Sequence, residues 1–121
     1  MKIIISHDAN ELGKEAAKFA VLKLNDAIRL NGEARIVVST GSSQLETFQA
    51  LIKEDIPWNK IEVFHLDEYI GLPITHKASF RKYLYERFIN LIKVKKFHGV
   101  EVEGEIANNI KSLSSELRKK P

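Results

Sequence analysis

The stretch FHLDEYIGLP at residues 64–73 decides the fold that this chain is expected to adopt. It completes the apolar run Ile61–Leu66, which predicts a strand buried on both faces, as in parallel sheets. Two carboxylates, Asp67 and Glu68, follow at once. Because ligands bind and catalytic side chains are displayed at the carboxyl ends of parallel strands, both are candidates for an active-site base. The alternative interpretation is that an Asp after a strand forms a turn or caps a helix.

A second polar stretch, Ser39–Ser43, follows the apolar run Ala34–Val38. A strand, a short loop of hydroxyls and glycine, and the start of a helix together favour anion binding, since the first amides of a helix lack partners and its dipole attracts negative charge. The candidate phosphate-binding residues are Thr40, Gly41, Ser42 and Ser43. The pattern is neither a Walker loop nor G-x-G-x-x-G, so it does not imply a nucleotide. The alternative is that Ser43 merely caps the helix.

The two stretches belong to one βαβ unit, which runs from Ala34 to Leu66. Such a unit joins parallel strands through a right-handed crossover. The Ser39–Ser43 loop and the Asp67-Glu68 pair are therefore expected at the same edge of the sheet. One of these elements suits a phosphate and the other suits proton transfer.

The rest of the chain predicts an α/β fold, with an open, mostly parallel, Rossmann-like sheet and helices on both faces. The β-branched run Ile3–Ile5 indicates a further buried strand, and residues 97–100 indicate either a short strand or an extended loop. Helices are expected near residues 9–30, 44–54, 79–91 and 105–119. Asp8 with Glu11 indicates a capping box at the start of the first helix, and Gly32 provides its end.

Apolar spacing predicts which helix faces turn inward. In the first helix these are Leu12, Ala16, Phe19, Ala20, Leu24, Ala27 and Ile28; in the third they are Phe80, Leu84, Phe88 and Leu91, with Arg81, Lys82, Glu86 and Arg87 outside the stripe. Among the histidines, His7 and His98 are expected at the surface or in caps. His65 is expected to be a hydrogen-bonded core residue, and His76 is close enough in sequence to reach the site.

Composition bounds the function classes. The chain has 121 residues, enough for one small domain, and 44% of them are hydrophobic. It has no cysteine, and no pair of histidines has metal-ligand spacing. The net charge of +3 comes with basic clusters at residues 93–96 and 118–120 that lack aromatic interleaving, which argues against nucleic-acid binding. No apolar run approaches a membrane span and no signal peptide is visible, so a cytoplasmic protein is expected.

These residues resemble the glucosamine-6-phosphate deaminase/isomerase family, whose wider group includes the 6-phosphogluconolactonases. The resemblance is carried by Thr40-Gly41-Ser42-Ser43 between a strand and a helix, by Trp58, by the stretch at 64–73, and by His76 and Ser79-Phe80. Asp-Glu-Tyr followed by Gly-Leu-Pro resembles the deaminase branch, since lactonases usually carry Asp-Glu-Arg there. The phosphate loop departs from the family, because Gly41-Ser42-Ser43-Gln44 stands where Gly-Gly-Thr-Pro or Gly-Ser-Thr-Pro is common.

The resemblance implies conversion of glucosamine 6-phosphate and water into fructose 6-phosphate and ammonia, without a metal or an organic cofactor. It implies that Asp67 is the general base moving a proton between C2 and C1 of the opened sugar. Gly41, Ser42 and Ser43 correspond to the phosphate loop, while Glu68 and Tyr69 are supporting motif positions, with Glu68 counted among the substrate-binding residues. The match covers about the first half of a family member. Residues 1–121 are therefore interpreted as an apparently truncated N-terminal half that lacks the ring-opening histidine and is inactive alone.

The function expected from sequence is thus a sugar-phosphate deaminase/isomerase of the hydrolase class in amino sugar metabolism. A small-molecule sugar phosphate is the expected partner, without nucleic acid or membrane, and a homo-oligomer is expected. Two alternatives stay open: a 6-phosphogluconolactonase-type hydrolase, and a sugar-phosphate sensor that does no chemistry. Sensors of this fold usually have a helix-turn-helix before the first strand, whereas here Met1 leads directly into it.

Overall fold

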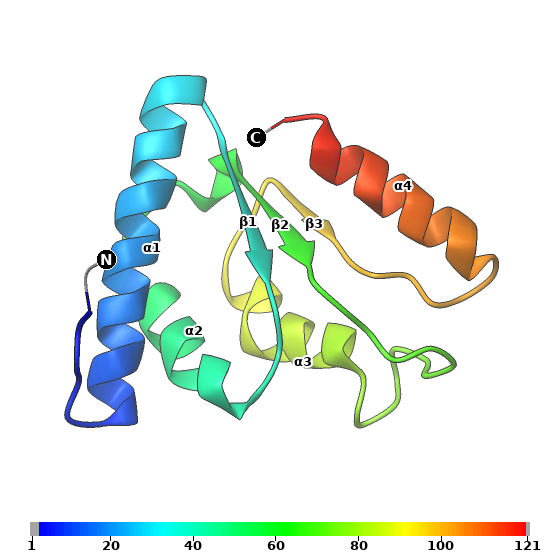
Figure 1. Ribbon diagram of the computed structural model, residues 1–121, viewed down its shortest axis with the longest axis horizontal. Helices are drawn as coiled ribbons and strands as arrows, with labels where there is room; N and C mark the ends of the chain where they lie inside the picture. The colour runs from blue at the N-terminus through cyan, green and yellow to red at the C-terminus, as the bar shows by residue number, and fades with distance from the viewer. Residues whose placement is uncertain (1–2, 121) are drawn as a thin grey trace.

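A three-stranded parallel sheet lies at the centre of the structure, a computed structural model in which residues 3–120 are described (Figure 1). The strand order is β1 (Ala34–Val38), β2 (Ile61–His65), β3 (Lys96–His98). Ala34 is in register with Ile61, and Glu62 with Lys96. The predicted parallel pairing of the two strands of the βαβ unit is confirmed, and residues 96–98 adopt the strand rather than the loop.

The predicted strand at Ile3–Ile5 is wrong. These residues are outside the sheet, and their side chains are 54–91% exposed. A short β-branched run becomes a strand only where another strand accepts its hydrogen bonds, and β1, β2 and β3 do not pair with it.

Four α-helices surround the sheet within the described part of the chain: α1 (Ala9–Asn31), α2 (Leu45–Leu51), α3 (Phe80–Arg87) and α4 (Ile106–Arg118). All four predicted helices are confirmed, with two C-terminal ends revised: α2 ends at Leu51 rather than near residue 54, and α3 ends at Arg87 rather than near residue 91. Short 3₁₀ turns precede α2 at Ser42–Gln44 and follow α3 at Ile89–Leu91. Tight turns of this kind are common at helix ends.

The ends of α1 follow from local sequence. The Asp8 side chain accepts a hydrogen bond from the Glu11 N–H at 2.8 Å, while the Glu11 carboxylate accepts one from the His7 N–H at 2.6 Å. This arrangement satisfies two amide groups near the helix start, as a capping box does. Gly32 is left-handed, with φ 79°, and its N–H donates to the carbonyl of Ile28. Both predicted helix signals are therefore confirmed.

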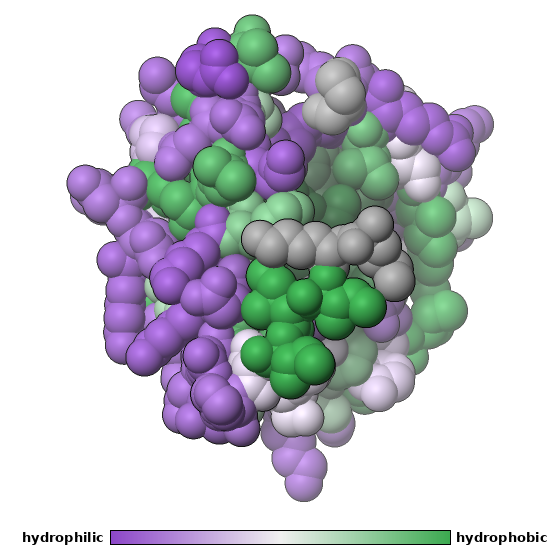
Figure 2. Space-filling model, turned by 60° about the vertical axis from the view of Figure 1, so that its left-hand side comes forward, coloured by the Kyte–Doolittle hydropathy of each residue, from purple (hydrophilic) through white to green (hydrophobic). Residues whose placement is uncertain are grey.

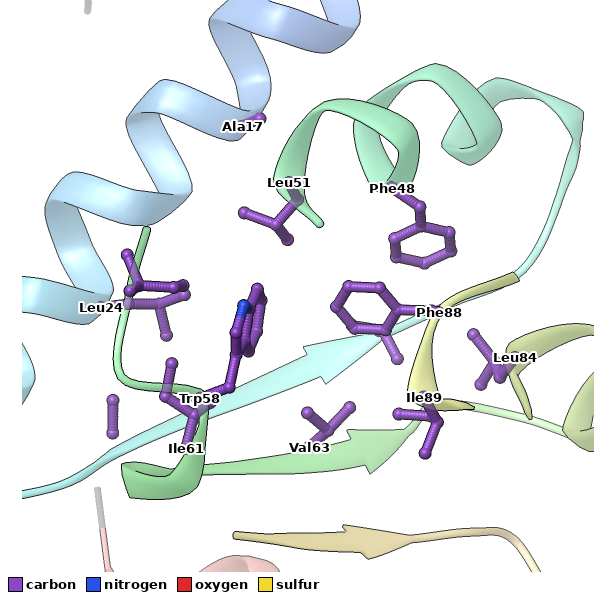
Figure 3. Close-up of a cluster of buried hydrophobic side chains, with 13 residues drawn as sticks. Ala17, Leu24, Phe48, Leu51, Trp58, Ile61, Val63, Leu84, Phe88 and Ile89 are labelled. Atoms are coloured by element: carbon purple, nitrogen blue, oxygen red, sulfur yellow. The ribbon is translucent and has the colours of Figure 1, made fainter. Parts of the chain in front are cut away.

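The main core lies between the sheet and the helices α1, α2 and α3 (Figure 3). Phe88 lies at its centre, stacked on Phe48 with ring centroids 4.7 Å apart and edge-on to Trp58 at 5.5 Å. The other buried members are Ala17, Leu24, Ala34, Val38, Leu51, Ile56, Ile61, Val63, Leu84 and Ile89.

The helix α4 covers the other face of the sheet, opposite α1 and α2 (Figure 1). Arg35 of β1 holds its C-terminal end, donating hydrogen bonds to the carbonyl oxygens of Glu116, Leu117 and Lys120 at 2.6–2.9 Å. The Arg35 guanidinium also lies 4.5 Å from the centre of the Phe64 ring. Helices therefore pack on both faces of the sheet, as predicted.

The buried face of α1 differs from the predicted one in the first half of the helix. Leu24 is buried and Ala20, Ala27 and Ile28 pack against the core, as predicted. Gly13 and Ala17 are buried instead of Leu12 and Phe19, which are more than half exposed. Small residues face α2 because they let the two helix backbones approach closely, so residue size rather than hydrophobicity sets the contact. Figure 2, which brings the α1 side forward, shows hydrophobic side chains gathered at the surface there.

Candidate functional site

The carboxyl ends of β1 and β2 lie side by side. Val38 is in register with His65, and the Leu66 N–H extends the ladder by donating to the Val38 carbonyl at 2.9 Å. The Thr40–Ser43 loop and Asp67 therefore leave the sheet at the same edge, as predicted from the βαβ unit.

The Thr40–Ser43 loop is shaped by Gly41, whose φ of 154° and ψ of 161° are accessible almost only to glycine. Its carbonyl accepts a hydrogen bond from the Gln44 N–H at 3.0 Å, which closes the turn before α2. No side-chain hydrogen bond caps either the turn or α2, so the alternative that Ser43 is only a helix cap is wrong. Within the described chain, the Thr40 hydroxyl is buried without a partner. Ser42 and Ser43 are exposed, whereas the Thr40 hydroxyl is enclosed by the protein, and phosphate binding by this loop stays a prediction.

Asp67 is exposed at the end of β2, and its carboxylate makes no hydrogen bond or ion pair with residues 3–120. It borders a cavity of about 350 Å³ between the sheet and α4, whose walls include Val37, Phe64 and Leu66. A carboxylate free of internal partners can accept hydrogen bonds from a ligand, and the role of Asp67 as a general base stays a prediction.

Glu68 differs from its neighbour, because its side chain is completely buried. Its carboxylate accepts hydrogen bonds from the N–H groups of Tyr69, Phe80 and Arg81 and from the Ser79 hydroxyl, at 2.8–3.0 Å. Burial raises the pKa of Glu68, but these donors outweigh it, so the pKa is lowered and the group is ionised. Its oxygens face protein donors, and substrate binding by Glu68 stays a prediction.

Arg81 was expected outside the apolar stripe of α3, yet it is 3% exposed. Its guanidinium donates to Glu101 at 2.6 Å and to both oxygens of Glu103 at 2.7 and 2.8 Å, and it lies 3.5 Å from Glu68. A signal was present in the sequence. A cation in the first turn of a helix opposes the helix dipole and therefore indicates carboxylate partners.

Two histidines also differ from expectation. His65 is buried, but within the described chain neither of its ring nitrogens has a hydrogen-bond partner, and burial lowers its pKa. His98 is buried rather than at the surface, because its ring stacks on Phe64 at 4.1 Å and its Nε2 lies 3.2 Å from Glu62. His76 stays in the exposed loop before α3.

Residues 3–120 contain no group of three His, Asp or Glu side chains placed to hold a metal ion. None of the helices in this range is both long and apolar enough to span a membrane.

The fold and the site define an α/β domain with a glycine- and serine-containing loop beside a free carboxylate at the carboxyl edge of a parallel sheet. The family described as glucosamine-6-phosphate isomerases/6-phosphogluconolactonase matches residues 7–121. The chain belongs to this family.

Relatives with assigned names agree with this membership. The glucosamine-6-phosphate deaminase of Dictyostelium discoideum is 33% identical over 105 residues, which cover 79% of this chain and 39% of that protein. The Phocaeicola vulgatus deaminase is 31% identical over 127 residues, which cover 94% of this chain and 48% of that protein. The chain thus spans about half the length of the curated relatives it matches, or less.

Solved structures share the fold. A monomeric glucosamine-6-phosphate deaminase superposes with a TM-score of 0.83 at 22% identity, over 97% of this chain and 50% of that one. A 6-phosphogluconolactonase from Shewanella baltica superposes with a TM-score of 0.77 at 24% identity, over 94% and 49% of the two chains.

Proposed function

We propose that the protein is a sugar-phosphate deaminase/isomerase that converts glucosamine 6-phosphate and water into fructose 6-phosphate and ammonia. The observation that carries this proposal is the unpartnered carboxylate of Asp67 on the same sheet edge as the Thr40–Ser43 loop. The relatives that bear the deaminase name support the choice of reaction.

In this proposal Asp67 is the general base that takes the proton from C2 of the opened sugar and returns it to C1. A single carboxylate suffices for such a transfer if the carbon is held next to it. Thr40, Gly41, Ser42 and Ser43 hold the phosphate group and so fix the distance between the sugar carbons and Asp67. Neither part requires a metal or an organic cofactor.

The proposal concerns a protein as long as the relatives, of which this chain covers 39–50%. The 121 residues by themselves are expected to be inactive, because the resemblance assigns ring opening to a histidine in the part of the relatives that this chain does not match.

Ammonia release from glucosamine 6-phosphate tests the assignment. Replacing Asp67 by Asn keeps the size of the side chain and removes the base, so kcat should fall by about 100-fold or more. Asp55→Asn is the matched control, because Asp55 is exposed in the loop before β2 and away from the site. An Asp67→Asn variant with wild-type kcat would contradict the proposal.

A lactonase activity is the second candidate, because the family description names both activities and a lactonase shares the fold. Hydrolysis of 6-phosphogluconolactone, measured beside ammonia release, separates the two. Lactone hydrolysis without ammonia release would replace the deaminase assignment. If the full-length protein binds sugar phosphates but turns over neither compound, the result would favour the alternative of a sugar-phosphate sensor without catalytic activity.

A further inference from the structure

Three segments of the carboxyl edge meet next to Asp67 at an ion cluster that is buried at Glu68 and Arg81, whereas the Glu101 and Glu103 side chains are 61% and 54% exposed. Glu68 comes from the end of β2, Arg81 from the first turn of α3, and Glu101 and Glu103 from the loop after β3. We call Glu68, Ser79, Arg81, Glu101 and Glu103 the carboxylate clamp. The Glu68 and Arg81 side chains are 0% and 3% exposed.

Most polar atoms of the clamp are hydrogen-bonded; within the described chain the buried Nε of Arg81 has no hydrogen-bond partner and lies 3.5 Å from Glu68. Buried charges are unfavourable unless they are paired and hydrogen-bonded. Glu68 receives four hydrogen bonds, and Arg81 donates three to Glu101 and Glu103. Hydrogen bonds between ionised partners are shorter and stronger than neutral ones, and the fork of Arg81 adds orientation. The cluster therefore fixes the relative positions of all three segments.

The clamp acts on Asp67 through the backbone. On one side, Leu66 is hydrogen-bonded to Val38 of β1; on the other, Glu68 is locked to the start of α3. Asp67 is the single residue between these two anchors, and its own side chain stays free. The following loop has few anchors of its own, because most of residues 69–78 are exposed.

We propose that Glu68 and Arg81 are positioning residues that hold Asp67 at the carboxyl end of β2 for proton transfer. Both act through the backbone of Asp67, and this role is separate from the predicted substrate binding by Glu68. The role in catalysis rests on the proposed function, whereas the hold on the Asp67 backbone does not. Proton transfer requires the base within hydrogen-bond reach of the carbon-bound proton, so a small displacement of Asp67 lowers kcat.

Two variants test the clamp. Glu68→Gln replaces one accepting oxygen by an NH₂ group that faces donors, because Gln has one acceptor where Glu has two. Arg81→Lys keeps the positive charge but loses the fork. Glu86→Gln is the matched control: Glu86 is on the same helix and pairs with Lys82 at 3.9 Å, but this pair is exposed.

In the full-length protein, Glu68→Gln should lower kcat for ammonia release by about 100-fold with little change in KM, since the phosphate loop is untouched. Arg81→Lys should lower kcat less, and Glu86→Gln should leave both constants unchanged. Loss of folded protein would also lower the apparent kcat at unchanged KM, so kcat is calculated per folded protein, measured by circular dichroism.

Amide hydrogen exchange supplies a readout independent of activity. The Leu66 and Tyr69 amides flank Asp67 and donate to Val38 and Glu68. In Glu68→Gln and Arg81→Lys both should exchange faster than in the wild type, while the Val63 amide in the middle of β2 should be unchanged. If the wild-type protein releases no ammonia, the proposed function fails and the exchange data alone decide the clamp.

Several results would overturn the inference. One is wild-type kcat in Glu68→Gln. Another is unchanged exchange at Leu66 and Tyr69. A third is exchange that rises equally at Leu66, Tyr69 and Val63, which would mean general destabilisation. If Glu68→Gln does not fold, the kcat and the amide exchange of Arg81→Lys test the inference in its place.

Discussion

Replacing Gly13 by Ala tests the contact between α1 and α2. Gly13 is in the second turn of α1, and in an isolated helix Ala at such a position is more stable than Gly by about 1 kcal/mol. Sequence reasoning therefore predicts a stabilising substitution. The structure predicts the opposite sign. A Cβ atom at Gly13 would lie 2.6–2.8 Å from the Glu46 backbone carbon, its carbonyl oxygen and its Cβ.

The expected magnitude follows from these distances. Overpacking a contact commonly costs about 1–3 kcal/mol, and backbone atoms inside 3 Å cannot be avoided by a rotamer change, which places this site near the upper end. Subtracting the gain of about 1 kcal/mol in helix propensity leaves a net destabilisation of about 2 kcal/mol. For a chain of this length that corresponds to a fall in Tm of roughly 8 °C.

Urea unfolding and thermal melting, followed by circular dichroism, measure the change. Asn25→Ala is the control, because Asn25 is exposed on the same helix and its replacement should stabilise by about 0.5 kcal/mol through propensity alone. A Gly13→Ala protein as stable as the wild type, or more stable, would refute the close approach of α1 and α2.

Three further predictions concern the loop, the clamp and the sheet edge. Gly41→Val should weaken the binding of glucosamine 6-phosphate, measured by calorimetry. Gly32→Val is the control, because it places a side chain on another positive-φ glycine away from the site. Equal affinities of the two variants would contradict phosphate binding by the Thr40–Ser43 loop. Hydrogen bonds from Arg81 hold the pKa of Glu103 at about 2 in the folded state, against 4.5 unperturbed. The contribution of Glu103 to the free energy of unfolding is therefore complete above about pH 4.5 and is lost as pH falls towards 2. The Glu103→Gln variant should therefore show a weaker pH dependence of the urea midpoint between these two pH values. In the described chain β1 pairs on one side only, and Val37 is partly exposed, so light scattering should show self-association of the 121-residue chain; a stable monomer at high concentration would contradict this.

Local chemistry made several features predictable from sequence. The Asp8 cap and Gly32 mark the ends of α1 because each acts on neighbouring backbone groups. The βαβ unit placed Asp67 and the Thr40–Ser43 loop on one edge, since a strand followed by a helix and another strand joins parallel neighbours with their carboxyl ends together. The residue types at that edge also sufficed to suggest the family that the comparisons establish.

Tertiary structure decided what depends on partners distant in sequence. Arg81 is buried because Glu68, Glu101 and Glu103 converge on it, and helical periodicity records only which residues share a face. His98 is buried for a similar reason, through Phe64 and Glu62.

The hydrophobic pattern likewise does not predict burial or strand formation correctly where these depend on the shape of a neighbouring helix or on the presence of a pairing strand. Ile3–Ile5 has the composition of a buried strand, but a strand exists only when another segment supplies its hydrogen bonds. The sequence by itself determined the helix ends, because these follow from interactions between near neighbours. It also determined the parallel pair of strands and the sheet edge where Asp67 lies, because a strand–helix–strand connection joins parallel neighbours. Only the tertiary structure decided that Gly13 rather than Leu12 faces α2, since how closely two backbones approach depends on both surfaces at once.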